Sequence, residues 1–153
     1  MKVQRRGTAI AMTSEERDEF LATERACRVA TVGADGAPHA TALWFVWDGA
    51  ALWLTSIVKS QRWADLQRDP RIAVVVDAGD GFMDLRGVEI TGTAEVIGEV
   101  PRTGNPIDEL RDPEQRFADK YAGGRVVHDG RHAWLKIVPD KIVSWDFRKI
   151  AGR

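Results

Sequence analysis

Three short runs rich in β-branched and aromatic residues, separated by glycine-containing turn signals, dominate the first half of the sequence. The runs are Arg28–Val32, Pro38–Trp47 and Ala51–Ser56. Asp35-Gly36 and Asp48-Gly49 stand between them. Asp-Gly pairs between apolar runs are strong hairpin signals, because glycine reaches positive φ without a Cβ clash. This stretch therefore predicts a three-strand antiparallel meander.

The rest of the chain adds strands and a few short helices. A capping-box pattern at Thr13 and Glu16, a Ser60 N-cap, and Pro113 at a first helical position predict three helices. These cover Ser14–Glu24, Gln61–Gln67 and Asp112–Tyr121. The further expected strands are Arg71–Val76, Leu85–Ile97, His132–Val138 and Lys141–Phe147, the last two joined by Pro139-Asp140. The fold class is therefore mainly β: an antiparallel, Greek-key-like barrel of about six to seven strands with two to three short helices.

Length and charge narrow the classes of protein. A chain of 153 residues with 44% hydrophobic and 29% charged residues fits one globular domain over residues 1–153. A net charge of -1 gives no footprint for nucleic acid, and no apolar run is long enough to span a membrane. We expect a cytoplasmic protein. The single Cys27 lies in an apolar run and is expected to be a buried, inert thiol.

No motif indicates a catalytic triad or a metal site. His128 and His132 are the only close histidine pair, but Asp129-Gly130 between them favours a turn in a solvated loop over a helical face with two ligands. Gly79-Asp80-Gly81 is too short for a dinucleotide-binding or P-loop motif. We therefore assign neither catalytic nor metal-binding residues.

The segment after the third run has the features of a phosphate site. A strand ends in hydroxyl residues, a loop carries Lys59, and a helix begins after Ser60 with Arg62 in its first turn. Free N–H groups and the helix dipole favour an anion at a helix N-terminus. Each charge-assisted hydrogen bond would contribute roughly 1.5–3 kcal/mol. The alternative is that Ser60 is only an N-cap and that both basic residues are solvated.

An ordered set of segments resembles a known superfamily. The set consists of Arg28–Val32, Asp35–His39, Leu43–Val46, Lys59–Arg62, Leu66–Arg71 and Ile72–Asp77. Together they resemble the pyridoxamine 5'-phosphate oxidase-like superfamily, particularly its flavin- and deazaflavin-dependent (F420) oxidoreductases. The resemblance covers Arg28 to about Val96 well and the C-terminal strands loosely.

The resemblance implies a split β-barrel homodimer with a cofactor in a groove between the subunits. The residues that fall on the phosphate-binding segment are Thr55, Ser56, Lys59, Ser60, Gln61 and Arg62. Leu43 and Trp44 fall on the strand that flanks the cofactor ring. Asp77, Ala78 and Asp80 fall on a loop near the cofactor groove of the deazaflavin-binding branch. The loop Val100–Asn105 is expected to shape the substrate pocket.

Departures from the vitamin B6 oxidases narrow the expected function. Ser60 is followed by Gln61 and Arg62 instead of adjacent Arg and Lys, and the C-terminus Ser144–Ile150 lacks the substrate elements of those enzymes. The resemblance thus implies an oxidoreductase that transfers a hydride between F420, or alternatively FMN, and a small conjugated substrate. One alternative is a protein that only binds or sequesters a flavin or haem. In another, the groove is empty and the six tryptophans pack the core or the dimer interface.

Overall fold

The computed structural model describes residues 1–151; residues 152 and 153, the end of the expected domain, lie outside the described residues. Seven strands form one antiparallel sheet in the order β2-β1-β5-β6-β7-β4-β3, as expected for the fold class. They are β1 (Cys27–Val32), β2 (Pro38–Leu43), β3 (Val46–Trp47), β4 (Leu52–Ile57), β5 (Arg71–Ala78), β6 (Arg86–Ile97) and β7 (His132–Asp146). The helices are α1 (Ser14–Thr23), α2 (Gln61–Arg68) and α3 (Asp108–Tyr121).

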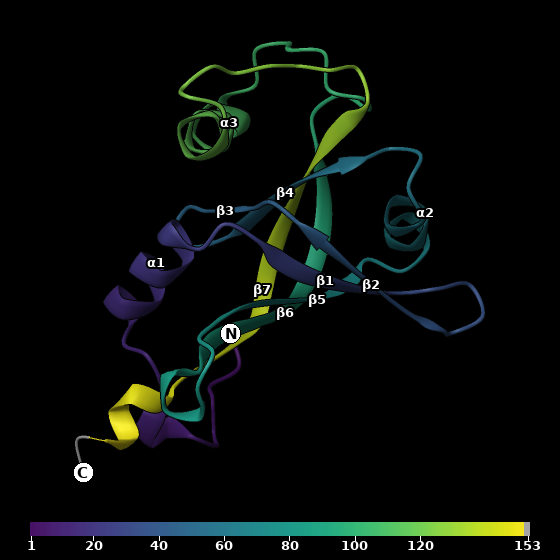
Figure 1. Cartoon of the computed structure of the whole chain (residues 1–153). Coiled ribbons are helices and arrows are strands. Elements are labelled where there is room, and N and C mark those ends of the chain that lie inside the picture. The colour runs from purple at the N-terminus through teal and green to yellow at the C-terminus, as the bar shows by residue number, and fades with distance from the viewer. Residues whose placement is uncertain (152–153) are drawn as a thin grey trace.

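The predicted three-strand meander is wrong, because the run Pro38–Trp47 is broken at Trp44 and Phe45. β2 pairs with β1 at one edge of the sheet, whereas β3 pairs with β4 at the other edge. The chain therefore crosses between the two edges through Trp44-Phe45 (Figure 1). Phe45 is fully buried in the main core, so core packing outweighs the local preference for a continuous strand.

The two long strands β6 and β7 form the spine of the curled sheet (Figure 1). The predicted turn at Pro139-Asp140 is wrong, since β7 continues through it. A register shift between Thr91 and Gly92 places Gly92 opposite Pro139. A Cβ at Gly92 would lie 2.1 Å from the Val138 carbonyl oxygen. The irregularity thus accommodates a proline that cannot donate to the ladder, and it requires glycine on the facing strand.

Helix α3 lies over one end of the sheet, above β3 and β4 (Figure 1). It begins at Asp108, not at Asp112 as predicted, so Pro113 lies inside the helix instead of at its first position. Leu110, on the added first turn, is fully buried in a second core cluster with Trp53 and Trp134. Burial of this apolar face explains why the helix extends beyond the proline signal.

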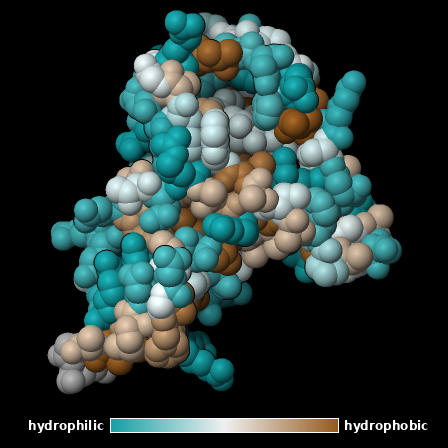
Figure 2. All heavy atoms as spheres, viewed as in Figure 1, coloured by the Kyte–Doolittle hydropathy of each residue, from teal (hydrophilic) through white to brown (hydrophobic). Residues whose placement is uncertain are grey.

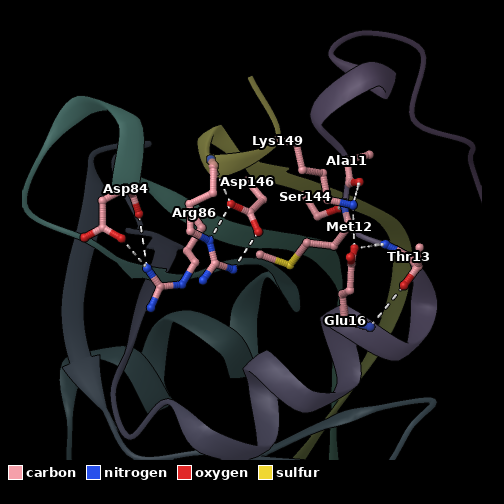
Figure 3. Close-up of polar contacts among 10 residues, drawn as sticks. Ala11, Met12, Thr13, Glu16, Asp84, Arg86, Ser144, Asp146 and Lys149 are labelled. Atoms are coloured by element: carbon pink, nitrogen blue, oxygen red, sulfur yellow. Dashed lines mark hydrogen bonds and ion pairs between the residues drawn. The ribbon is translucent and has the colours of Figure 1, made fainter. Parts of the chain in front are cut away.

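The N-terminal segment is tied to the end of β7 and the 3₁₀ turn Phe147–Ile150 (Figure 3). Met12 N donates to Ser144 Oγ at 2.9 Å. Lys149 Nζ donates to the Ala11 carbonyl at 3.0 Å and to Glu16 Oε2 at 2.6 Å. Glu16 also completes the predicted capping box with Thr13, which is confirmed. These contacts fix helix α1 against the sheet.

Cys27 is fully buried, as expected, and burial raises the pKa of its thiol to about 12. Among residues 1–151, no helix has the length and apolar character needed to cross a membrane.

Candidate functional site

Arg62 links β2 and β4 across the opening of the curled sheet. Its Nε donates to Ser56 Oγ of β4 at 3.1 Å, and its Nη1 donates to Thr41 Oγ1 of β2 at 2.8 Å. The side chain is buried, with 6% of the residue exposed, and no carboxylate within residues 1–151 forms a salt bridge with it. Burial lowers the pKa of the guanidinium from its ordinary value. A buried positive charge with only hydroxyl partners favours an anion nearby.

The N-terminus of α2 adjoins this guanidinium. Ser60 is the N-cap and accepts a hydrogen bond from Trp63 N at 3.1 Å, so the predicted cap is confirmed. Its hydroxyl also lies 3.4 Å from Ser56 Oγ. Lys59, one residue earlier, is exposed and free of salt bridges to the described residues. The N-terminus of α2 therefore brings together the hydroxyls of Ser56 and Ser60, the buried guanidinium of Arg62 and the exposed amine of Lys59.

Gln61, also expected in this segment, contributes to the fold of α2. Its Nε2 donates to Asp65 Oδ1 at 2.8 Å. Asp65 is fully buried and also accepts from Thr31 Oγ1 and Arg68 Nη2. The hydrogen bonds from Gln61, Thr31 and Arg68 lower the pKa of the Asp65 carboxyl. The carboxylate therefore anchors α2 on β1 and keeps Arg62 aimed at the split.

A cavity of about 550 Å³ lies beneath α3, on the other side of β4 from Ser56. Leu43, Trp44 and Thr55 line it, so three of the expected cofactor residues come together there. Ser56 faces the main core, because successive residues of a strand point to opposite faces. Thr41 and Ser56 contact Arg62, and their neighbours in the sequence, Ala42 and Thr55, line the cavity. Arg62 and the cavity therefore lie on opposite sides of the same two strands, β2 and β4. In Figure 2, apolar side chains gather across the middle of the visible face, below α3.

Aromatic rings form much of the cavity wall. Trp44 is 51% exposed and stacks on Tyr121, with ring centroids 4.5 Å apart and planes within 5°. Phe117 lies 6.2 Å from Trp44 and 5.7 Å from Trp134, between centroids. The Tyr121 hydroxyl also accepts from Phe45 N at 3.1 Å, so α3 fixes the crossing segment that carries Trp44. The cavity therefore has a rigid flat surface with one ring open to a ligand.

A buried ionic network supports the far wall. Arg102 donates to Glu114 Oε1 at 2.6 Å, to Glu99 and to the Asn105 carbonyl. Glu114 Oε1 also accepts from Trp134 Nε1 at 3.2 Å. Arg102 belongs to the loop that was expected to shape the pocket, and it lines the cavity. Its charge is already balanced by two carboxylates.

The loop after α3 closes one side of the cavity with polar groups. Arg125, His128, Asp129 and His132 line it. The expected turn is confirmed, since residues 125–130 are not helical, and His132 Nδ1 lies 2.5 Å from Asp129 Oδ2. His128 is exposed and His132 is partly exposed, in agreement with the expected solvated loop, and both side chains also line the cavity. Among residues 1–151, no group of three or more His, Cys, Asp or Glu side chains could hold a metal ion.

The structure does not bring the segment Asp77–Asp80 to the cavity of the same chain. Asp77 forms an ion pair with Arg28 at 3.0 Å. Ala78 packs against the main core, and Asp80 is exposed beside Asp84. A cofactor role for Asp77, Ala78 and Asp80 stays a prediction that needs a second subunit.

Sequence reasoning missed the contribution of α3. Phe117 and Tyr121 are four residues apart, a spacing that places two side chains on one helix face, and this signal was available. Arg125 carried no signal, because a lone arginine after a Gly-Gly pair is common in loops.

Comparison with known proteins places this geometry in a family. The family model described as pyridoxamine 5'-phosphate oxidase matches residues 13–146. The chain belongs to the pyridoxamine 5'-phosphate oxidase family. The match covers the whole seven-stranded sheet as well as α2 and α3, so the superfamily resemblance seen in the sequence is confirmed. Among curated proteins, none matches the sequence.

Solved structures agree with this membership. A conserved hypothetical protein from Mycobacterium tuberculosis is 30% identical, with a TM-score of 0.82, over 97% of this chain and 93% of that chain. An F420 reductase is 25% identical, with a TM-score of 0.60, over 82% of this chain and 94% of that chain. A haem-binding protein from Mycobacterium smegmatis shares the fold at 17% identity, with a TM-score of 0.66, over 94% of this chain and 62% of that chain.

Proposed function

We propose that this member of the pyridoxamine 5'-phosphate oxidase family is an oxidoreductase that uses F420, or alternatively FMN, to transfer a hydride to or from a small conjugated molecule. The observation that carries the proposal is Arg62, a buried guanidinium without a carboxylate partner in the described chain, next to an aromatic cavity. The proposal includes a homodimer acting in the cytoplasm, with the cofactor groove between subunits.

The donor set at α2 fits the phosphate of such a cofactor. Arg62 supplies a fixed charge, Lys59 a mobile one, and Ser56 and Ser60 supply hydroxyls. The first N–H groups of α2 have no acceptor within the helix and favour an anion. Neutralisation by a phosphate would balance the buried charge of Arg62, which the protein itself leaves without a counter-ion.

The aromatic wall fits the flat ring. Trp44 exposes half of its surface, Leu43 and Thr55 flank it, and Tyr121 holds its plane from behind. A planar ring system would gain contact area there without ordering flexible side chains. Support also comes from the F420 reductase, which is 25% identical over 82% of this chain.

When bound, a reduced deazaflavin or flavin would supply two electrons and one hydrogen as a hydride to an electron-poor carbon of the acceptor, and a solvent proton would complete the reduction. The chain's own residues bind and orient. Trp44 and Phe117 exclude water from one face of the cavity, and Arg62 fixes the anionic end of the cofactor. No protein side chain has to act as an acid or base, in keeping with the absence of a predicted triad.

Titration of the purified protein with F420 and with FMN, followed by tryptophan fluorescence, tests the proposal. We expect one of the two to bind in the submicromolar to micromolar range and to support turnover of an electron-poor acceptor. Binding without turnover would favour a carrier. Failure of both cofactors to bind would overturn the cofactor assignment.

Haem binding is the second candidate function. His128 lines the aromatic cavity, and its imidazole makes no hydrogen bond to another residue of the described chain 1–151. The haem-binding protein from M. smegmatis shares the fold. A Soret band on mixing with haemin that disappears in His128→Ala would support this function; its absence would leave the oxidoreductase as the better candidate.

A further inference from the structure

The charged side chains that line the cavity beneath α3 are not all paired with one another. Six ionisable side chains face it: Arg102, Glu114, Arg125, His128, Asp129 and His132. Both carboxylates are engaged within the protein. Glu114 accepts from Arg102 and from Trp134, and Asp129 accepts from Arg131 N and His132 N and contacts the His132 ring.

Arg125 is the exception in this wall. Its backbone N–H donates to Ala122 O, but its guanidinium makes no hydrogen bond, ion pair or ring contact with any residue that the structure describes. Helix α3 ends just before it, and Gly123 and Gly124, both at positive φ, turn the chain so that residue 125 reaches the cavity. A planar guanidinium with five donors recognises a carboxylate bidentately.

The cavity wall opposite Arg125 is aromatic and favours a planar ligand. Trp44 offers a half-exposed ring that Tyr121 holds parallel from behind, and Phe117 stands between Trp44 and Trp134. Leu43, Val126 and Val127 add apolar surface. The cavity volume of about 550 Å³ exceeds what a single small ring system fills, and pockets of this size bind small organic molecules.

We propose that this cavity binds the substrate as a planar conjugated carboxylate that packs on Phe117 beside the cofactor ring on Trp44, with its carboxylate on Arg125. The inference rests on the proposed function and names the substrate class of that site. Arg62 and Lys59 take the cofactor phosphate at the mouth of the split, whereas Arg125 takes the substrate charge under α3. The two anion sites lie on different elements and can be altered separately.

Two probe ligands of the same shape but different charge separate the contribution of the carboxylate to binding from that of the ring. 2-Naphthoate and 2-naphthamide have the same fused ring, but only the first carries a charge at neutral pH. Binding of each is followed by quenching of tryptophan fluorescence, with and without saturating F420 or FMN. We expect 2-naphthoate to bind at least five times more tightly than 2-naphthamide to the wild-type protein.

Substitutions in the cavity wall show which residues cause the difference in affinity between 2-naphthoate and 2-naphthamide. Arg125→Gln is expected to weaken 2-naphthoate about tenfold, which corresponds to about 1.4 kcal/mol, and to change 2-naphthamide less than about twofold. Phe117→Ala is expected to weaken both probes. Arg111→Gln removes an exposed arginine of α3 that pairs with Asp108 and does not line the cavity, so it should change neither. Arg125 is exposed in a loop, and its substitution should leave the melting temperature unchanged.

The outcomes separate the two proposals. Equal affinity for the two probes, or an Arg125→Gln protein that binds 2-naphthoate as tightly as the wild type, overturns the substrate assignment. If 2-naphthoate fails to bind while F420 or FMN binds, the substrate assignment falls and the cofactor proposal stands. If 2-naphthoate binds with the expected dependence on Arg125 while neither cofactor binds, the cavity assignment as an anion site holds and the oxidoreductase proposal falls.

Discussion

Arg62 on α2 donates a 2.8 Å hydrogen bond to Thr41 on β2, although four strands separate β2 from β4, the strand before α2, in the order of the sheet. A second bond to Ser56 holds the same guanidinium on β4. One side chain therefore spans the opening of the split barrel. Its position joins a structural role, closure of the split, to the proposed role in holding a phosphate.

Replacement of Arg62 separates these two roles. Arg62→Met keeps much of the side-chain volume but removes the charge and both hydrogen bonds. We expect a loss of about 1–3 kcal/mol in the free energy of unfolding and at least a tenfold weaker binding of the cofactor. Chemical denaturation measures the first quantity and fluorescence titration the second.

Two further variants make the result specific. Arg62→Lys retains the charge without the fork of donors and should recover part of the binding. Arg71→Met removes an exposed arginine that follows the same helix and pairs with Asp69, so it should leave binding unchanged. Cofactor affinity equal to the wild type in a folded Arg62→Met protein would reduce Arg62 to a structural link.

Lys59 is expected to contribute affinity without stability. Its side chain is exposed and forms no salt bridge within residues 1–151, so Lys59→Ala should leave the melting temperature unchanged. Cofactor binding should weaken several-fold, and the loss should shrink as salt is added, because exposed charges are screened. Titrations at two ionic strengths measure this; a loss that does not depend on salt would contradict a direct charge contact.

The network around Arg102 is expected to set the stability of the cavity wall. Arg102→Met leaves Glu114 with only Trp134 as a partner in a largely buried position. Breaking such a pair from one side costs about 3 kcal/mol. We expect a clear fall in the denaturation midpoint, whereas Arg116→Met, which removes the exposed Arg116–Asp112 pair of α3, should cost little. Similar midpoints for both variants would show that the network adds no stability.

Local signals in the sequence were sufficient for most elements. The capping box at Thr13 and the N-cap at Ser60 depend on neighbours in sequence, and both form as predicted. The errors arose where tertiary contacts outweighed local ones. Burial of Phe45 divides one predicted strand between two sheet edges. A register shift in β6 lets β7 continue through Pro139, where the sequence predicted a turn.

The residues of the candidate site likewise include some that the sequence could predict and some that depend on tertiary contacts. The resemblance names Leu43, Trp44 and Thr55, and all three line the cavity. It gives Thr55 to the phosphate segment, however, whereas the alternation along β4 turns this side chain to the aromatic side. The spacing of Phe117 and Tyr121 marks a shared helix face, but the cavity wall that Phe117 forms with Arg125 could not be assigned, because it depends on how α3, inserted between β6 and β7, folds back over β4. No periodicity in the sequence encodes that approach.

The buried thiol of Cys27 and the partly buried amine of Lys120 are expected to give opposite pH dependences of stability. Burial raises the pKa of Cys27 to about 12, so the folded protein holds a proton that the unfolded chain releases near 8.5. This contribution is present below about pH 8.5 and is lost as the pH rises toward 12. Burial, with a smaller contribution from Arg25, lowers the pKa of Lys120 to about 8. Above that pH the unfolded chain holds more protons at Lys120, so this contribution rises with pH.

Between about pH 8.5 and 10 the two effects oppose each other, and the wild-type free energy of unfolding should change little. Cys27→Ala removes the falling contribution, so its stability relative to the wild type should increase by up to about 1.4 kcal/mol per pH unit in this range. Lys120→Met should show the reverse trend. Urea denaturation at several pH values measures both. Parallel pH curves for wild type and Cys27→Ala, or native-state alkylation of Cys27 by iodoacetamide, would contradict a buried thiol that stays protonated.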